Sequence, residues 1–260
     1  MNVATRIQEV EEYYFSKKLR EIEQLKSKGV DVINAGIGSP DLRPHETVIN
    51  ELQVSTKDEN AHQYQSYRGI SELREAFSSW YKRYYNVLLD PEKNILPLMG
   101  SKEGIMHISL AFLNKGDTAL VPNPGYPTYA SATKMAEANV LQYELSPSTN
   151  WLPDYNKIEE NDLSQVKIMW INYPHMPTGA KATAQDLEKM ASFGLKHDIL
   201  ICSDNPYSFI LNNKYESLLS CNRFKSNIIE LNSLSKSHNM AGWRIGMVAG
   251  NKNLIDSILK

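Results

Sequence analysis

The sequence predicts an α/β fold, a three-layer α/β/α arrangement in which helices cover both faces of a mostly parallel central sheet. From about residue 99 onward, short apolar segments alternate with longer segments of helical periodicity, which is typical of this class. The 260 residues suffice for one large domain, and the 42% hydrophobic and 22% charged content is that of an ordinary globular protein.

The predicted elements follow one another in a regular order. Residues 5–28 carry apolar side chains near helical spacing, which predicts a charged amphipathic helix ended by Gly29. A short strand over 32–38 opens into a glycine-bearing loop. The final residues, 254–260, form a helix without a C-terminal cap. Between these, we expect helices at 102–113, 129–137 and 184–197 and strands at 118–121, 140–143, 167–171, 199–203 and 228–231.

Composition disfavours several classes of protein. The net charge of −2 gives no electrostatic basis for binding nucleic acid or an acidic membrane. No apolar run is long enough to cross a bilayer, and residues 1–28 have the pattern of neither a signal nor a transit peptide. Two cysteines, Cys202 and Cys221, are too few for a disulfide framework, so we expect a cytoplasmic protein. The six histidines show no close ligand spacing, and no metal site is expected.

The most informative segment lies just beyond the predicted strand 228–231. Lys236 is flanked by serines and followed eight positions later by Arg244. A lysine amine can form an imine with an aldehyde, while hydroxyls and a guanidinium can hold a dianionic phosphate. A lone lysine would more simply be a solvated loop residue, so its neighbours must decide between the two interpretations.

The segment 233–246 resembles the lysine motif of the fold-type I pyridoxal-phosphate aminotransferases, which include aspartate aminotransferase. It is most similar to the branch of LL-diaminopimelate aminotransferase-like enzymes. The resemblance implies that Lys236 forms a Schiff base with pyridoxal 5'-phosphate and later carries a proton between the amino acid's α-carbon and the cofactor. It also implies that Ser233, Ser235 and Arg244 bind the cofactor phosphate.

A second group of residues lies at the end of the preceding predicted strand. Asp204 ends that strand, where an unpaired carboxylate is costly, and a pyridinium N–H is a suitable partner. Alone, the sequence Asp-Asn-Pro-Tyr is an ordinary turn after a strand. The resemblance implies that Asp204 pairs with the ring nitrogen and that Tyr207 bonds the ring's 3-oxygen.

Two further segments are expected at the cofactor. Gly100 and Ser101 begin a predicted helix whose first free N–H groups can bind phosphate, although such helix starts are common caps. The resemblance places phosphate contacts at Gly100, Ser101 and Lys102, the last through its backbone N–H. Residues 122–129 read as a Pro/Gly turn, in which the resemblance implies that Tyr126 stacks on the cofactor ring.

Two segments nearer the N-terminus complete the resemblance. Residues 64–76 resemble a loop whose tyrosine, here Tyr64, reaches the phosphate of the neighbouring subunit, which implies a homodimer with shared sites. Residues 36–41 resemble a loop whose backbone, at Gly38, approaches the substrate carboxylate. Residues 1–35 are then expected to form an N-terminal helix or arm and part of a small domain, and residues 36–260 the large cofactor-binding domain.

The resemblance runs from about Gly36 to the end, with two departures. Met176 stands where the family has an asparagine that donates a hydrogen bond to the cofactor's 3-oxygen, and a thioether cannot donate. We expect weakened tuning of the imine pKa, and compensation by His175 or Asn172 is open. Second, family members continue into a small C-terminal domain whose arginine binds the substrate carboxylate. We therefore expect a fragment or the product of a disrupted gene, with a natural truncation as the alternative.

The predicted function is transfer of an amino group between an L-amino acid and a 2-oxo acid. One alternative is β-elimination of a sulfur amino acid on the same scaffold. Another is a cofactor-binding protein without full turnover. A transcriptional regulator is disfavoured because the N-terminal region has room for one helix but not for a winged-helix domain. Which amino acid is used cannot be predicted from these motifs.

Overall fold

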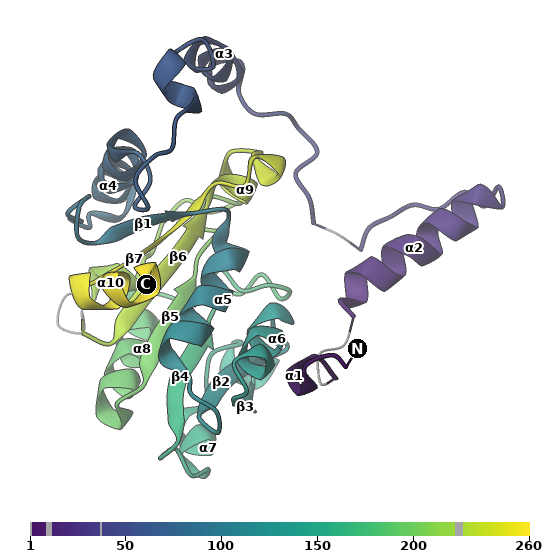
Figure 1. The fold of residues 1–260 in the computed structure, drawn as a ribbon. Coiled ribbons are helices and arrows are strands. Elements are labelled where there is room, and N and C mark those ends of the chain that lie inside the picture. The colour runs from purple at the N-terminus through teal and green to yellow at the C-terminus, as the bar shows by residue number, and fades with distance from the viewer. Residues whose placement is uncertain (1, 9–11, 37, 222–225) are drawn as a thin grey trace.

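A seven-stranded sheet forms the centre of the protein (Figure 1). The computed structural model describes residues 2–8, 12–36, 38–221 and 226–260. The strand order is β1-β7-β6-β5-β4-β2-β3, and only β7 runs antiparallel to the others. The strands are β1 (Ile95–Leu98), β2 (Thr118–Asn123), β3 (Asn139–Glu144), β4 (Val166–Ile171), β5 (Leu200–Asp204), β6 (Ile228–Ser233) and β7 (Gly246–Gly250).

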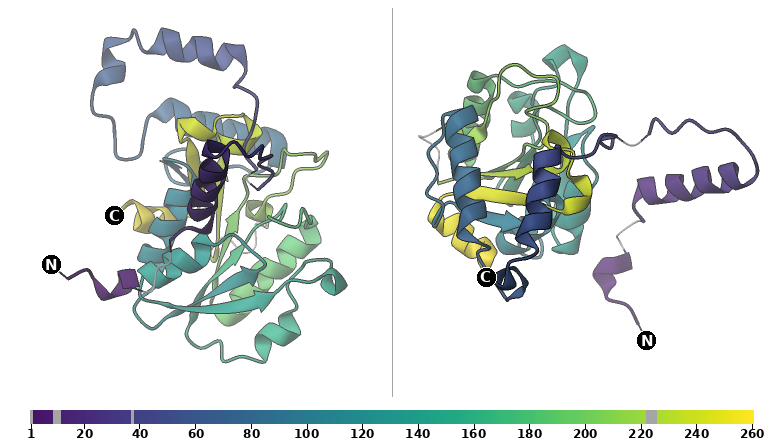
Figure 2. Two further views of the ribbon diagram at one scale, coloured as in Figure 1. Left: turned by 90° about the vertical axis from the view of Figure 1, so that its right-hand side faces the viewer. Right: turned by 90° about the horizontal axis from the view of Figure 1, so that it is seen from above.

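Helices cover both faces of this sheet (Figures 1 and 2). On one face α4 and α8 pack against the strands, and on the other α5, α6 and α10 do so. The helices of the body are α4 (Ser71–Tyr85), α5 (Ser101–Phe112), α6 (Thr128–Met135), α7 (Tyr155–Glu159), α8 (Ala184–His197), α9 (Leu234–Ser237) and α10 (Lys252–Leu259). Short 3₁₀ turns lie at Glu59–His62 (η1), Pro147–Thr149 (η2), Leu218–Ser220 (η3) and Ala241–Trp243 (η5).

Strand β4 shows why the sheet is covered on both sides. Met169 and Ile171 belong to the apolar core under α4 and α8, whereas Ile168 and Trp170 belong to the core under α5 and α6. All four side chains are fully buried. A strand that is apolar on both faces needs a layer on each side, which is typical of parallel sheets. The predicted three-layer α/β/α fold is therefore confirmed.

The strand directions bring the ends of distant segments to one edge of the sheet. Strands β1 and β6 are both antiparallel to β7, so β1 runs in the same direction as β2 to β6. The carboxyl ends of these six strands thus lie on the same side as the amino end of β7. Ligands of such sheets bind beyond this edge.

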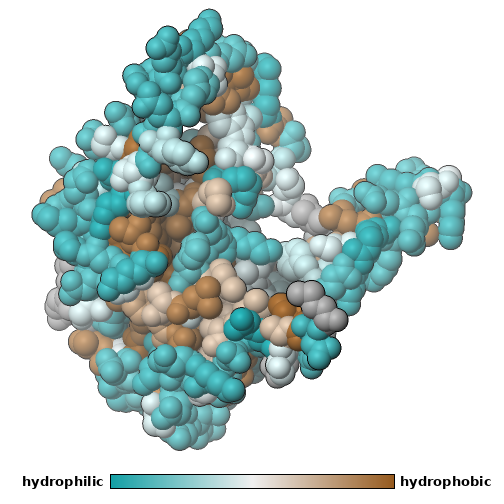
Figure 3. Space-filling model, viewed as in Figure 1, coloured by the Kyte–Doolittle hydropathy of each residue, from teal (hydrophilic) through white to brown (hydrophobic). Residues whose placement is uncertain are grey.

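The N-terminal region differs from the prediction. Instead of one helix over 5–28, the structure has α1 (Thr5–Gln8) and α2 (Tyr14–Ser27), and residues 9–11 lie outside the described part. Helix α2 projects from the body, has no buried residue and is mostly hydrophilic in Figure 3. The predicted strand at 32–38 was wrong for residues 32–36 and 38, which form no strand, and Ile37 lies outside the described residues. Within the described part of the chain no strand pairs with this segment, and Ile33 is 91% exposed.

The remaining helices and strands agree closely with the predictions. The helices expected at 102–113, 129–137 and 184–197 are α5, α6 and α8, and the five expected strands are β2 to β6. Strand β1 was missed because it contains Pro97, which edge strands tolerate and central strands rarely do. Helices α3 (Glu46–Ser55) and α7 and strand β7 were missed as well. Among the described residues, no helix is both long and apolar enough to span a membrane.

Candidate active site

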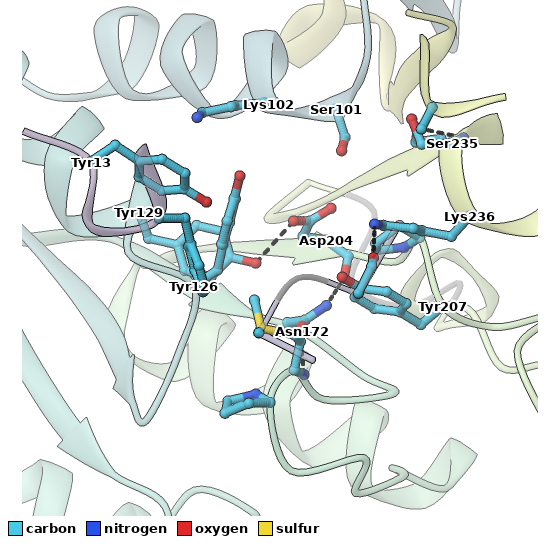
Figure 4. A pocket seen from close by; sticks show the side chains of 18 of the residues that line it. Tyr13, Ser101, Lys102, Tyr126, Tyr129, Asn172, Asp204, Tyr207, Ser235 and Lys236 are labelled. Atoms are coloured by element: carbon cyan, nitrogen blue, oxygen red, sulfur yellow. Dashed lines mark hydrogen bonds between the residues drawn. The ribbon is translucent and has the colours of Figure 1, made fainter. Parts of the chain in front are cut away.

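A cavity of about 750 Å³ opens at the edge where the six parallel strands end (Figure 4). Its wall comes from the segments that follow β1, β2, β4, β5 and β6, from the segment that precedes β7, and from the N-terminal region. The lining residues are Tyr13, Phe15, Ser16, Leu19, Ala35, Gly36, Gly38, Ser101, Lys102, Tyr126, Tyr129, Asn172, Met176, Pro177, Asp204, Pro206, Tyr207, Ser233, Ser235, Lys236, Ala241 and Arg244.

The cavity gathers almost all residues that the sequence selected. Gly100 is not in the lining, but it directly precedes Ser101 and is the N-cap of α5. Tyr64 is also outside, and its side chain is fully exposed on the segment between η1 and α4. The predicted residues that line the cavity are Gly38, Ser101, Lys102, Tyr126, Asp204, Tyr207, Ser233, Ser235, Lys236 and Arg244.

Asp204 is the last residue of β5 and lies at the floor of the cavity. Its Oδ2 accepts a hydrogen bond of 3.0 Å from the Tyr129 hydroxyl, but its Oδ1 is buried and has no partner in the part of the chain that the structure describes. Burial raises the pKa of Asp204 to about 6, although the Tyr129 hydrogen bond lowers it. A buried carboxylate oxygen without a donor is costly, so Oδ1 is suited to receive an N–H from a ligand.

Aromatic rings form the wall beside Asp204. The Tyr129 ring stacks on Trp170 with centroids 5.0 Å apart and planes 8° apart, and Tyr126 meets Tyr129 edge-on at 5.6 Å. Burial raises the pKa of Tyr129, and the Asp204 charge adds to this, so its hydroxyl remains a donor at neutral pH. Tyr129 was not selected from the sequence, although its position three residues after Tyr126 and at the beginning of the predicted helix 129–137 could have indicated it.

Lys236 lies on α9, a four-residue helix that begins directly where β6 ends. Its Nζ donates a hydrogen bond of 2.6 Å to the Gly38 carbonyl. The lysine is half-buried, and this burial lowers its pKa, which favours the neutral, nucleophilic amine. The Ser233 hydroxyl caps α9 by accepting a 3.1 Å bond from the Ser235 N–H.

Hydroxyl, guanidinium and backbone N–H donors also belong to the cavity lining, at Ser101, Ser235 and Arg244. Arg244 adopts a left-handed backbone with φ of 57°, and its guanidinium donates to the carbonyls of Ala241 (2.9 Å) and Met99 (3.3 Å). Gly100 has φ of 86°, and a Cβ there would lie 2.3 Å from Arg244 Nη2. The glycine is thus required for the guanidinium to lie at the start of α5. Ser101 and Ser235 complete a set of donors suited to a phosphate.

Two further phenol groups, those of Tyr13 and Tyr207, line the cavity. Burial raises the pKa of Tyr207 to about 12, with smaller contributions from the charges of Asp204 and Tyr126. Burial also raises the pKa of Tyr13, and the neighbouring Tyr126 raises it further. The Lys102 ammonium lies 4.4 Å above the Tyr13 ring, so its side chain turns away from the start of α5. Tyr13 was not selected from the sequence, because nothing in a charged helical segment indicates a site.

The segment that contains Met176 also contains Asn172 and His175, the two candidates to compensate for its missing donor. Met176 lines the cavity, and its backbone N–H donates to Asn172 Oδ1 at 2.8 Å. Asn172 Nδ2 in turn donates to the Asp204 carbonyl at 2.6 Å. His175 is not in the lining, and its Nδ1 bonds the Thr178 hydroxyl. Of the two candidates for compensation, only Asn172 therefore reaches the cavity.

Known proteins of one family match this sequence. The sequence model described as "Aminotransferase class I and II" matches residues 30–260. An LL-diaminopimelate aminotransferase of Dehalococcoides mccartyi is 42% identical over 99% of this chain and 67% of its own length. The LL-diaminopimelate aminotransferase of Halothermothrix orenii is 40% identical over the same shares.

Solved structures agree with these sequence relatives. The substrate-bound structure of BacF from Bacillus subtilis has a TM-score of 0.94 at 34% identity, covering 100% of this chain and 66% of that one. Aspartate aminotransferase of Thermus thermophilus with maleate has a TM-score of 0.92 at 25% identity, covering 100% and 67%. The chain thus spans about two thirds of the length of the proteins it matches.

Proposed function

Because the chain belongs to the class I and II aminotransferases, a pyridoxal-phosphate-dependent family, we propose that it transfers an amino group between an amino acid and a 2-oxo acid. Lys236 holds the cofactor covalently in this proposal. The observation that carries it is the buried Oδ1 of Asp204, which has no partner among the described residues and belongs to the same cavity lining as Lys236. Asp204 would accept the ring N–H of the bound cofactor through this oxygen.

The other residues of the cavity fit the rest of the cofactor. Tyr126 offers an aromatic face for the ring, and Tyr207 offers a phenol for the 3-oxygen. The phosphate fits the N-terminus of α5 at Gly100 and Ser101, with the backbone N–H of Lys102. The hydroxyls of Ser233 and Ser235 and the Arg244 guanidinium complete that site. When bound, pyridoxal phosphate supplies the electron sink that stabilises a carbanion.

The protein's own groups have distinct tasks in this reaction. The Lys236 amine, whose pKa burial lowers, is the nucleophile and the group that carries a proton to and from the substrate carbon. The Gly38 carbonyl holds Lys236 Nζ at 2.6 Å and lies where a substrate carboxylate would approach. Tyr129 keeps Asp204 ionised by donating to Oδ2. Phe15 and Leu19 add apolar side chains to the lining of the cavity.

The names of the relatives suggest a first substrate. The curated relatives at 36–42% identity are named LL-diaminopimelate aminotransferases, so LL-diaminopimelate is the first amino donor to test. A cavity of about 750 Å³ falls within the range of small-molecule sites and has room for a cofactor and an amino acid together.

We also propose a homodimer in which Tyr64 completes the partner's site. The side chains of Tyr64 and Tyr67 are 106% and 98% exposed, and neither lines the cavity of its own chain. Aromatic side chains left in water on one segment are suited to a protein interface. In the same proposal residues 1–35 are an arm with part of a small domain, and residues 36–260 are the large domain. Mixing Tyr64→Ala and Lys236→Ala subunits tests it, since a mixed dimer has one intact site and should recover activity.

The activity is tested by screening amino donors against the protein with added cofactor. Conversion of the lysine-bound absorbance band to that of the amine form of the cofactor, followed by its return with a 2-oxo acid, is the expected result. Lys236→Ala is the control and should show neither change. Release of pyruvate and ammonia without an oxo acid would instead indicate β-elimination, and a band that no donor changes would contradict transfer.

A further inference from the structure

We propose that Glu230 is a positioning residue, whose carboxylate fixes the helix of Lys236 through a chain of buried hydrogen bonds along the sheet face opposite Asp204. Glu230 pairs in register with Ser203 on the neighbouring strand, whereas Asp204 pairs with Leu231, so the two carboxylates project from opposite faces. This inference rests on the proposed role of Lys236.

Glu230 is fully buried in the middle of β6 and is surrounded by donors. Its Oε1 accepts hydrogen bonds of 2.8 Å from the hydroxyls of Tyr81 on α4 and of Ser217. Its Oε2 accepts a bond of 2.9 Å from the Leu218 N–H. Burial raises the pKa of Glu230 above its ordinary value, and the bonds from Ser217, Leu218 and Tyr81 offset only part of this increase. Three donors converging on both oxygens are the arrangement that an ionised carboxylate needs.

The chain continues from Tyr81 to the lysine helix. The Tyr81 oxygen accepts from Asn232 Nδ2 at 3.0 Å, and Asn232 Oδ1 accepts from the Ser233 N–H at 2.8 Å. Ser233 is the N-cap of α9, and its hydroxyl accepts the Ser235 N–H. Asn232 and Ser233 are buried and Ser235 is half-buried, and of these groups only the two serines line the cavity. The chain therefore joins a carboxylate outside the cavity to the first turn of the helix that carries Lys236.

The direction of every bond in this chain is determined from its two ends. The Ser233 backbone N–H can only donate, so it must bond Oδ1 of Asn232, and Nδ2 of Asn232 then points toward Tyr81. Tyr81 must then donate its own hydrogen to Glu230, which accepts through both oxygens. An isolated helix of four residues has no stability of its own, so the orientation of α9 depends on such contacts.

Ser217 provides a matched control for Tyr81. Both hydroxyls are buried and donate to the same Glu230 oxygen at the same distance, but only Tyr81 leads to Ser233. Ser217 instead caps the turn at Leu218–Ser220. Tyr81→Phe and Ser217→Ala each remove one donor and leave the Glu230 carboxyl in place. This matters because the Glu230 charge also raises the pKa of Asp204, which would confuse a direct substitution of Glu230.

The experiment measures melting temperature without cofactor, and the dissociation constant of pyridoxal phosphate with the pKa of its lysine-bound absorbance band. Both variants should lower the melting temperature. Only Tyr81→Phe should weaken cofactor binding, by about fivefold, and shift the pKa of the band. Asn232→Ala removes the next link of the chain and should behave like Tyr81→Phe. It serves as the second variant if Tyr81→Phe does not fold.

Equal cofactor affinities in Tyr81→Phe and Ser217→Ala would overturn the positioning role, as would an unchanged band pKa in Tyr81→Phe. A wild-type chain without any lysine-bound band would instead contradict the proposed function itself, so the two failures can be told apart.

Discussion

The hydroxyl of Tyr129 donates to one oxygen of Asp204 at 3.0 Å, while the other oxygen of that carboxylate is buried and meets no donor from residues 2–8, 12–36, 38–221 or 226–260. The half-satisfied pair lies at the carboxyl end of β5, in the wall of the cavity that Lys236 also lines. A carboxylate with one fixed donor and one free oxygen is oriented and ready for a second donor. This oxygen stabilises a bound ring N–H, and its burial without a donor destabilises the cofactor-free protein.

Asp204→Asn should therefore stabilise the cofactor-free protein at neutral pH. The folded-state pKa of Asp204 is about 6 against an ordinary 3.8, so the unfolded chain loses its proton first as pH rises. The wild type then loses stability from about pH 4 to pH 6, and the asparagine variant, which cannot ionise, does not. We expect the variant's advantage in unfolding free energy to grow by about 3 kcal/mol over this range. Urea denaturation at about pH 4 and pH 7.5 measures it; a constant difference would contradict the raised pKa.

Tyr129→Phe should weaken cofactor binding without removing the carboxylate. The Tyr129 hydrogen bond lowers the pKa of Asp204, so its loss raises that pKa further and reduces the ionised fraction near neutrality. We expect about fivefold weaker binding of pyridoxal phosphate, with a larger deficit at pH 6 than at pH 8. Tyr143→Phe is the control, because Tyr143 is also buried and donates to the Trp170 carbonyl away from the cavity. Absorbance titration of each variant at both pH values decides between them.

Gly100→Ala should disrupt the phosphate site by contact as well as by backbone strain. Its Cβ would lie 2.3 Å from the Arg244 guanidinium, and φ at this position is 86°. Gly116→Ala is a matched control, since Gly116 has a similar φ of 91° but no atom within 4 Å of a Cβ. Both variants should lose about 1 kcal/mol of stability, and only Gly100→Ala should bind the cofactor at least about tenfold more weakly. Similar affinities in the two variants would remove Arg244 from the proposed phosphate site.

Met176→Asn should lower the pKa of the lysine-bound cofactor. Met176 lines the cavity, and an amide there restores a donor for the 3-oxygen, which favours its anionic form. The amide of Asn172 is already held by its hydrogen bonds to the Asp204 carbonyl and the Met176 backbone N–H. It therefore does not compete with the new side chain as a donor. Spectral titration of wild type and variant measures the shift, and Met176→Leu should leave the pKa where it is in the wild type. Identical pKa values for wild type and Met176→Asn would show that the missing donor has no effect.

The fold was largely predictable because β4, β5 and β6 are short apolar runs between helices of clear periodicity. Such runs bury both faces in any doubly covered sheet, so local pattern and tertiary structure agree. Strand β1 was not predictable in the same way, because Pro97 contradicts strand propensity and only its place at the sheet edge permits it. The expected strand at 32–38 failed for the opposite reason, since an apolar run needs a neighbouring strand and none of the described strands pairs with it.

The site was predictable where residues follow strands. Asp204, Ser233 and Lys236 each lie at or just beyond the carboxyl end of a recognisable strand, and strand direction alone brings them together. Tyr13 and Glu230 could not be found in this way. Tyr13 reaches the cavity from a segment far away in sequence, and Glu230 acts through Tyr81, whose contact spans 149 residues. Long-range contacts of this kind leave no local pattern.

The central claim is that the amine of Lys236 binds pyridoxal phosphate covalently. The direct measurement is to incubate the 260-residue chain with the cofactor, reduce it with borohydride and map the modified peptide by mass spectrometry. Lys102 is the other amine in the lining, so Lys102→Ala is the control and should remain labelled. We predict one reduced pyridoxyl group per chain on Lys236 and none on Lys236→Ala. A label on another lysine, or an unlabelled wild-type chain, would contradict the account.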